Sequence, residues 1–140
     1  MSRYVLDTNI LVYIMNEMLD DDTEALLEGY ENQIYVSSVS VMEFTHLLQN
    51  GRITSKRRPI DNVLRFIEEE LGFRVLYVSR EHLMQFEQLP VVEGHNDPND
   101  RMIIAQAINE RMELISSDNA FRHYRRFGLQ YVQAVKISHS

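Results

Sequence analysis

The sequence predicts a three-layer α/β/α fold, in which a five-stranded, mostly parallel sheet carries helices on both faces. Segments of strand composition alternate along the chain with segments of helical period, which is the order that repeated βαβ units produce. The 140 residues suit a single domain, residues 1–140, and a hydrophobic content of 44% is that of an ordinary globular protein.

The predicted elements follow one another in a regular order. Strands are predicted at residues 3–6, 33–37, 74–78, 113–116 and 129–135. Helices are predicted at residues 9–16, 22–32, 39–49, 59–71, 81–88, 97–111 and 119–127. Asp22 is the predicted N-cap of the second helix, and Pro59 fits the first turn of the fourth.

Composition narrows the function. A formal charge of −7 argues against a general nucleic-acid coat protein, although an acidic chain can act on nucleic acid when metal cations neutralise its carboxylates. With no cysteine, disulfides and thiolate metal sites are excluded, and a reducing cytoplasm is the expected location. No segment is apolar enough for a membrane helix, and Asp7 interrupts what would be the core of a signal peptide.

Two carboxylates directly follow predicted strands. Asp7 comes after the first strand and Asp118 after the fourth. In a doubly wound sheet, functional groups gather past the carboxyl ends of the strands, where the strand order reverses. If the first and fourth strands are neighbours, Asp7 and Asp118 face each other. The alternative is that each Asp simply caps the helix that follows it.

Two further acids begin the helix in "HNDPNDRMIIAQAINER". Asp97 before Pro98 fits an N-cap, which explains it without chemistry. Asp100 lies instead on the apolar stripe that the helix buries, formed by Ile103, Ile104, Ala107 and Ile108. Burying an unpaired carboxylate costs several kcal/mol, so a cation must compensate it. Arg101 points about 100° away and is a poor partner.

Glu43 follows the second strand in "VSSVSVMEFTHLL". Ser40 and Glu43 have the spacing of a capping box, which is a structural explanation. The position, which we expect in the first turn of the helix, also brings Glu43 to the carboxyl edge of the sheet. Four carboxylates at one edge repel one another, and Mg²⁺ or Mn²⁺ would relieve that repulsion with oxygen ligands alone. Such a site supports hydrolysis of phosphodiester bonds.

The segments "VLDTNILVY", "SSVSVMEF", "HNDPNDRMIIAQA" and "LISSDNAF", in this order, resemble the PIN-domain nucleases. More narrowly, they look like the VapC-type toxins of toxin–antitoxin pairs. The resemblance covers nearly the whole chain and implies a five-stranded parallel sandwich with Mg²⁺- or Mn²⁺-dependent endoribonuclease activity. Its motifs place the catalytic and metal-binding acids at Asp7, Glu43, Asp100 and Asp118.

The same resemblance implies supporting positions and partners. Asn9 and Ser117 match polar positions that support the site, while Asp97 matches an Asp that is not usually a metal ligand. The chain departs from the family pattern at Asn99, where an aromatic residue is common, and at Ser117, where Thr is common. The implied partners are RNA, a second copy of the chain, and an antitoxin whose segment covers the active-site cleft.

Two basic stretches are candidates for RNA contact. In "FRHYRRF", Phe121, Tyr124 and Phe127 recur every three residues and are expected to pack inward. That places Arg122, with Arg125 and Arg126, toward water and close to Asp118, so Arg122 is a candidate substrate contact. The other stretch is "GRITSKRRP". A solvated helical face is the alternative for both.

Other interpretations remain open. The apolar segment "ILVYIMNEMLDDDTEALL" fits either a contact with another chain or ordinary core packing. A catalytically silent PIN-like RNA-binding or scaffold module is the main functional alternative, and the presence of all four acids disfavours it. A receiver-type phosphoacceptor domain would need an acidic pair at the first strand, where Asp7 stands alone. Cleavage of DNA also stays open, because metal-assisted hydrolysis does not need a 2′-hydroxyl group.

Overall fold

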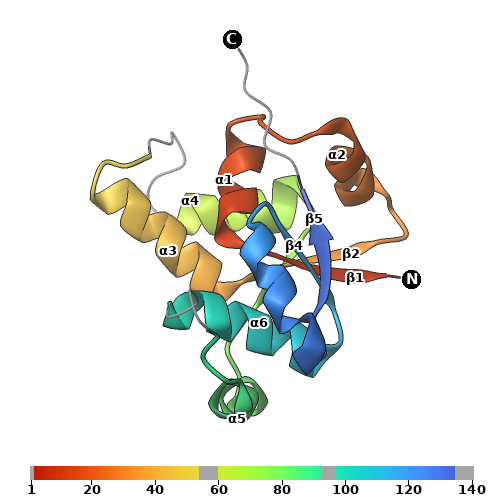
Figure 1. Ribbon diagram of the computed structural model, residues 1–140. Helices are drawn as coiled ribbons and strands as arrows, with labels where there is room; N and C mark the ends of the chain where they lie inside the picture. Colours follow the sequence, from red (N-terminus) through yellow and green to blue (C-terminus); the bar gives the residue numbers. More distant parts are fainter. Residues whose placement is uncertain (1, 54–59, 93–96, 135–140) are drawn as a thin grey trace.

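The computed structural model describes residues 2–53, 60–92 and 97–134, which form a five-stranded sheet flanked by helices (Figure 1). The strands are β1 (Arg3–Leu6), β2 (Gln33–Ser37), β3 (Arg74–Leu76), β4 (Glu113–Ser116) and β5 (Gln130–Gln133). Their order is β3-β2-β1-β4-β5, and every neighbouring pair is parallel. The predicted fold class is therefore confirmed, including the adjacency of β1 and β4.

The helices begin and end close to their predicted positions. They are α1 (Thr8–Met15), α2 (Asp21–Glu28), α3 (Ser38–Gln49), α4 (Ile60–Arg65) with the π-helical turn η1 (Phe66–Glu70), α5 (Arg80–Gln88), α6 (Pro98–Glu110) and the 3₁₀ helix η2 (Asn119–Phe127). The predicted place of Pro59 lies outside the described residues. The last strand, predicted at residues 129–135, is shorter than predicted and spans Gln130–Gln133.

The limits of α2 correct the predicted helix at residues 22–32. Asp20, not Asp22, is the N-cap, because its carboxylate accepts both the backbone N–H and the hydroxyl of Thr23, at 3.1 and 2.7 Å. The helix ends at Glu28, and the Asn32 side chain donates to the carbonyl of Leu26 at 2.8 Å. This bond satisfies a carbonyl of the last turn, which has no partner within the helix.

The third strand is two residues shorter than predicted. It ends at Leu76, which pairs with Ser37, the last residue of β2. Beyond that point the backbone of β2 turns into α3, so no ladder remains for the next residues of the third strand. The N–H of Val78 donates instead to the hydroxyl of Ser38, at 3.3 Å. Tyr77 is thereby carried off the sheet.

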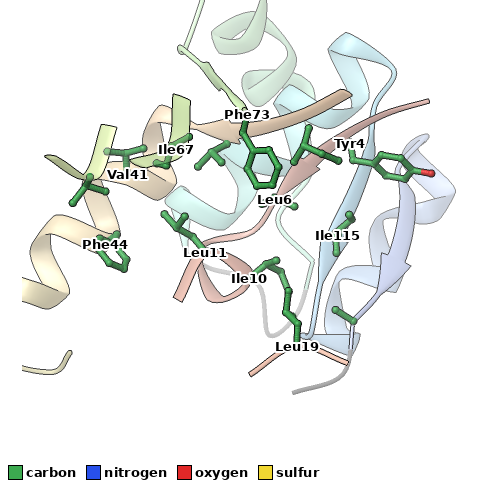
Figure 2. Close-up of a cluster of buried hydrophobic side chains, with 14 of the residues drawn as sticks. Tyr4, Leu6, Ile10, Leu11, Leu19, Val41, Phe44, Ile67, Phe73 and Ile115 are labelled. Atoms are coloured by element: carbon green, nitrogen blue, oxygen red, sulfur yellow. The ribbon is translucent and has the colours of Figure 1, made fainter. Parts of the chain in front are cut away.

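Side chains alternate between two cores, one on each face of the sheet. In β1, Tyr4 and Leu6 belong to one core and Val5 to the other, as the two-residue period of a strand requires. The first core packs against α1, α3, α4 and η1, and Figure 2 shows it around Leu6 and Phe73. The second packs against α6 and η2, which lie on the opposite side (Figure 1). Helix α3 contributes to both cores.

The three-residue period in η2 is explained by its 3₁₀ geometry. Three residues complete one turn of such a helix, so Phe121, Tyr124 and Phe127 line one side. Phe121 and Tyr124 are fully buried and Phe127 packs against the same core, as predicted. Arg122 is exposed on the other side.

The apolar residues after Asp7 are accounted for by core packing. Ile10, Leu11 and Leu19 are buried, and the partly buried residues Val12, Tyr13, Ile14, Met15, Leu26 and Leu27 pack against the same cluster. In the described part of the chain, no helix combines the length and the apolar character needed to cross a membrane.

A buried glutamine joins α6 to two strand ends. Gln106 is fully buried, and its Oε1 accepts from the hydroxyl of Ser37 at 2.5 Å. Its Nε2 donates to the carbonyl of Leu76 at 3.2 Å. Ser37 also caps α3 by accepting from the N–H of Val39. One side chain thus fixes the ends of β2 and β3 and the start of α3 relative to α6.

We expect Gln106→Leu to lower the free energy of unfolding by about 1–3 kcal/mol, because buried polar groups on Ser37 and Leu76 lose their partner. Gln88→Leu, at an exposed amide on α5, is the matched control and should change stability by less than about 0.5 kcal/mol. Urea unfolding of both variants measures the difference. Equal stability of the two variants would contradict the role given to Gln106.

Candidate active site

Asp7 lies at the end of β1 and at the start of α1. Its N–H donates to the carbonyl of Ile115 in β4 at 3.0 Å, which continues the pairing of the two strands. Its carboxylate accepts from the N–H of Thr8 at 2.7 Å and from the hydroxyl of Ser116 at 2.9 Å. Asp7 therefore does cap α1, as the structural explanation proposed, yet it is only 3% exposed and lines a cleft.

Asp118 occupies the equivalent place after β4. It caps η2 by accepting from the N–H of Ala120 at 2.9 Å, and its own N–H donates to Ser116 Oγ at 3.0 Å. Ser116 thus contacts both Asp7 and the backbone of Asp118. The two aspartates are brought to the same edge because β1 and β4 are neighbours.

Asp100 enters the cleft from the first turn of α6. Asp97 is the N-cap of this helix and accepts from the N–H of Asn99 at 2.9 Å, as predicted. Asp100 is half-buried. The adjacent Arg101 points elsewhere, with its guanidinium 4.5 Å from the centre of the Phe86 ring. Arg101 is therefore not the compensating partner of Asp100, in agreement with the helical geometry.

Glu43 comes from the second turn of α3, not from the first as predicted. The helix begins at Ser38 and Ser37 is its N-cap, so the predicted capping box of Ser40 and Glu43 is wrong. Ser40 is buried, and its Oγ lies 3.2 Å from Thr8 Oγ1. The Glu43 carboxylate accepts from the hydroxyl of Thr8 at 2.7 Å, which holds it toward the end of β1.

All four predicted acids line one cleft of about 980 Å³ at the carboxyl edge of the sheet. Asn9 and Asp97 line it as well. Ser117 and Arg122 are not among the described residues of its wall: Ser117 Oγ lies 3.3 Å from the hydroxyl oxygen of Tyr13, and Arg122 donates to the carbonyl of Asn119 at 2.9 Å.

Burial and the neighbouring carboxylates raise the pKa values of Asp7 and Asp100. Burial raises the pKa of Asp7 from 3.8 to about 6, against the hydrogen bonds from Ser116 and Thr8, and the charges of Glu43 and Asp118 add to the rise. Burial also raises the pKa of Asp100 to about 7, followed by the charges of the other four acids of the cleft. Among the main causes of the two shifts, no basic side chain of the described residues offsets this negative charge.

The donor set fits a hard divalent cation. Every candidate ligand is a carboxylate oxygen, the donor type that Mg²⁺ and Mn²⁺ prefer. Within the described residues, no group of three or more Asp, Glu or His side chains is already arranged as a metal-binding set. Mg²⁺ usually keeps several waters and takes only one or two protein carboxylates together with substrate phosphates, and an open cleft suits that mode.

Two polar residues of the site were missed from sequence. Thr8 joins Asp7 to Glu43, and Ser116 joins Asp7 to Asp118. Their signal was proximity: Thr8 follows the first Asp in the chain, and Ser116 ends the strand before the second. Choosing Ser116 over its neighbour Ser117 required the register between the two strands.

The protein is an α/β protein with a parallel sheet, and its acids gather at the edge where the strand order reverses. A family model described as the PIN domain matches residues 4–126, and the chain therefore belongs to the PIN domain family. The family predicted from the four sequence segments is confirmed. Among curated protein sequences, none matches this chain.

Solved structures of two VapBC complexes and of FitAcB share the fold. A chain of VapBC2 from Rickettsia felis, bound to a DNA fragment from its promoter, has 21% identity and a TM-score of 0.70, with 95% of this chain and 99% of that chain covered. DNA-bound VapBC from Salmonella typhimurium has 20% identity and a TM-score of 0.66, with 95% of this chain and 98% of that chain covered. FitAcB from Neisseria gonorrhoeae has 16% identity and a TM-score of 0.65, with 93% of this chain and 96% of that chain covered. At these identities the likeness establishes the fold.

The raised pKa values predict how stability depends on pH without metal. Because the pKa of Asp7 is about 6 in the folded protein and near 3.8 in the unfolded chain, ionising it costs roughly 3 kcal/mol more when folded. The folded state then binds more protons in this range, so stability falls as pH rises through the folded pKa. Asp100 extends the fall to about pH 7.

We expect Asp7→Asn and Asp100→Asn to melt at a higher temperature than the wild type in EDTA at about pH 8, and to lose part of the pH dependence. Added Mg²⁺ or Mn²⁺ should stabilise the wild type most, because only it keeps all four carboxylates as candidate ligands. Asp22→Asn, at an exposed carboxylate on α2, is the control. If both cleft variants melt below the wild type in EDTA and metal does not favour the wild type, the acids belong to the scaffold.

Proposed function

We propose that the protein is a divalent-metal-dependent endoribonuclease and the toxin of a type II toxin–antitoxin pair. The observation that carries the proposal is the set of four carboxylates, Asp7, Glu43, Asp100 and Asp118, lining one cleft at the carboxyl edge of the sheet. Two of them, Asp7 and Asp100, have pKa values raised by burial and by the charges of the neighbouring carboxylates. This cost is understandable if the negative potential serves to bind cations.

When bound, Mg²⁺ or Mn²⁺ would supply the acidity that activates a water and the charge that neutralises a phosphodiester. The chain would supply the ligands and their orientation. Thr8 and Ser116 fix the Asp7 carboxylate from two sides, and Thr8 also holds Glu43. Asp100 and Asp118 bring negative charge from α6 and from the end of β4. All four are proposed as catalytic and metal-binding residues.

Four residues are proposed to support the substrate. Asn9 and Asp97 line the cleft beside the acids. Ser117 and Arg122 flank Asp118 on its two sides in the chain, and Arg122 is exposed, where it can meet a phosphate. Lys56, Arg57 and Arg58 of the second basic stretch lie outside the described residues.

The proposed partners are RNA, an antitoxin and a second copy of the chain, with residues 1–140 acting as one nuclease domain in the cytoplasm. The antitoxin is supported by the fold that this chain shares with chains of VapBC complexes. The cytoplasm is supported by the absence of cysteine. All four acids in one cleft favour a nuclease over a silent RNA-binding or scaffold module.

We expect purified protein to cut single-stranded RNA with Mn²⁺ or Mg²⁺, leaving 3′-hydroxyl and 5′-phosphate ends, because the nucleophile is then water and not the 2′-hydroxyl. Mapping the ends of mixed RNA, with and without EDTA, tests this. Cyclic-phosphate ends, or cleavage that persists in EDTA, would exclude the mechanism. A matched DNA substrate in the same assay shows whether the 2′-hydroxyl matters.

Expression of the chain alone should arrest growth of a bacterial host, and Asp7→Asn or Asp100→Asn should relieve the arrest. Asp22→Asn, remote from the cleft, should remain as toxic as the wild type. Growth curves after induction measure the effect, and immunoblots confirm equal soluble protein. Undiminished toxicity of both cleft variants would remove the role assigned to these residues.

A further inference from the structure

The carboxylates occupy only part of the cleft. Much of the remaining wall is apolar or aromatic and comes from α3, α4, β3 and the residue that follows β3. These side chains are Val41, Met42, Leu47, Ile60, Leu64, Val75 and Tyr77. Met42 is 55% exposed and Tyr77 is 65% exposed. The Tyr77 ring is too exposed to contribute much to the core, and it lines the cleft that also holds the acids.

The backbone around Tyr77 is fixed on both sides. The carbonyl of Leu76 accepts from Gln106 Nε2 at 3.2 Å, and the N–H of Val78 donates to Ser38 Oγ at 3.3 Å. The backbone on either side of Tyr77 is therefore held by Gln106 of α6 and by Ser38, the first residue of α3. Ordinary strand spacing puts the ends of β1 and β3, with β2 between them, roughly 10 Å apart. Tyr77 and the acids therefore line one cleft from different strand ends.

Basic side chains continue the wall beyond the apolar part. His46, near the end of α3, and Arg52, just past it, are exposed and line the same cleft. Acids, an exposed aromatic ring and a guanidinium group therefore share one groove. Proteins that bind single-stranded nucleic acid combine basic groups, which contact the phosphate backbone, with aromatic rings on which unpaired bases stack.

We propose that Tyr77 is a stacking platform for an unpaired base of single-stranded RNA, and that Arg52 receives a phosphate farther along the same strand. The inference rests on the proposed nuclease function and deepens it by naming two side chains that hold the RNA. RNA engages the ring through a base next to the reacting phosphate, which would lie at a cation bound by Asp7, Glu43, Asp100 and Asp118. Duplex RNA, whose bases are already stacked, cannot use the platform.

The binding test uses short single-stranded RNAs carrying 2-aminopurine at successive positions, and the corresponding duplexes. All proteins carry Asp100→Asn, so that the RNA stays intact in Mg²⁺. We expect quenching at one position, and we expect Tyr77→Ala to abolish it and to raise the Kd roughly tenfold. Tyr77→Phe and Tyr77→Trp should retain both the quenching and the affinity.

Two controls separate stacking from other effects. Tyr77→Leu keeps an apolar side chain and should behave like Tyr77→Ala; if it binds as tightly as Tyr77→Phe, stacking is wrong. Tyr30→Ala removes a tyrosine that is 98% exposed and lines a different cavity, beside α2, and should change nothing. If Tyr77→Ala shows the same quenching and Kd as Tyr30→Ala, the inference is overturned. If those two values are unchanged and Tyr77→Ala instead releases a co-purified antitoxin, Tyr77 serves to dock a protein and the inference is likewise overturned.

Kinetics of proteins that keep all four acids test the nuclease proposal and the Tyr77 inference separately. Cleavage by the wild type tests the nuclease proposal by itself, and a wild type that cuts no RNA in Mn²⁺ or Mg²⁺ refutes it. Given cleavage, Tyr77→Ala should raise KM roughly tenfold with little change in kcat, because the ring holds a base and not the reacting phosphate. An unchanged KM with an active wild type refutes the Tyr77 inference alone.

Discussion

A buried carboxylate beside three others is the constraint around which this edge of the molecule is built. Asp7 is almost inaccessible to water, and two hydrogen bonds, from Thr8 and Ser116, favour its charged form. They do not offset burial and the nearby negative charges, since the pKa of Asp7 stays near 6. A group that served only to cap α1 would not need this surrounding charge. Under the proposed function, a bound cation would offset this repulsion, and this is how the fold would be connected to the proposed chemistry.

The topology places the four acids at the carboxyl edge of the sheet. The sheet reverses between β1 and β4, which brings Asp7 and Asp118 together from distant parts of the chain. Helices α3 and α6 deliver the other two acids, and Gln106 ties these helices to the strand ends. The two cores lie on opposite faces of the sheet, and Val41 from one and Phe121 from the other reach the wall of the cleft. Repulsion among the acids costs stability at this edge, as is common where a site trades stability for function.

The sequence predicts the strands and the four acids because these depend on local pattern. Asp7 and Asp118 follow apolar strands, and Asp100 falls on the buried stripe of its helix, so one-dimensional spacing suffices. The start of α3 could not be read in this way, because Ser37, Ser38 and Ser40 are all good N-caps. The choice is made by the sheet: β2 runs as far as Ser37, which is paired with Leu76. The same ambiguity among Asp20, Asp21 and Asp22 displaced the predicted start of α2.

Residues that depend on register were out of reach of the sequence. Leu6 pairs with Ile115, so the next residues along the two strands are Asp7 and Ser116, and Ser117 falls on the other side. No local pattern states that register.

Tyr77 is a similar case, since a strand through residue 78 would have placed its ring against the face of the sheet. Instead β3 stops when its neighbour β2 becomes helical, and the tyrosine emerges beside the cleft. The same event, the turn from β2 into α3, thus sets both the position of Glu43 and the exposure of Tyr77. A change in the length of β2 would move an acid and an aromatic ring together, which ties the reacting end of the cleft to the end proposed to hold the base.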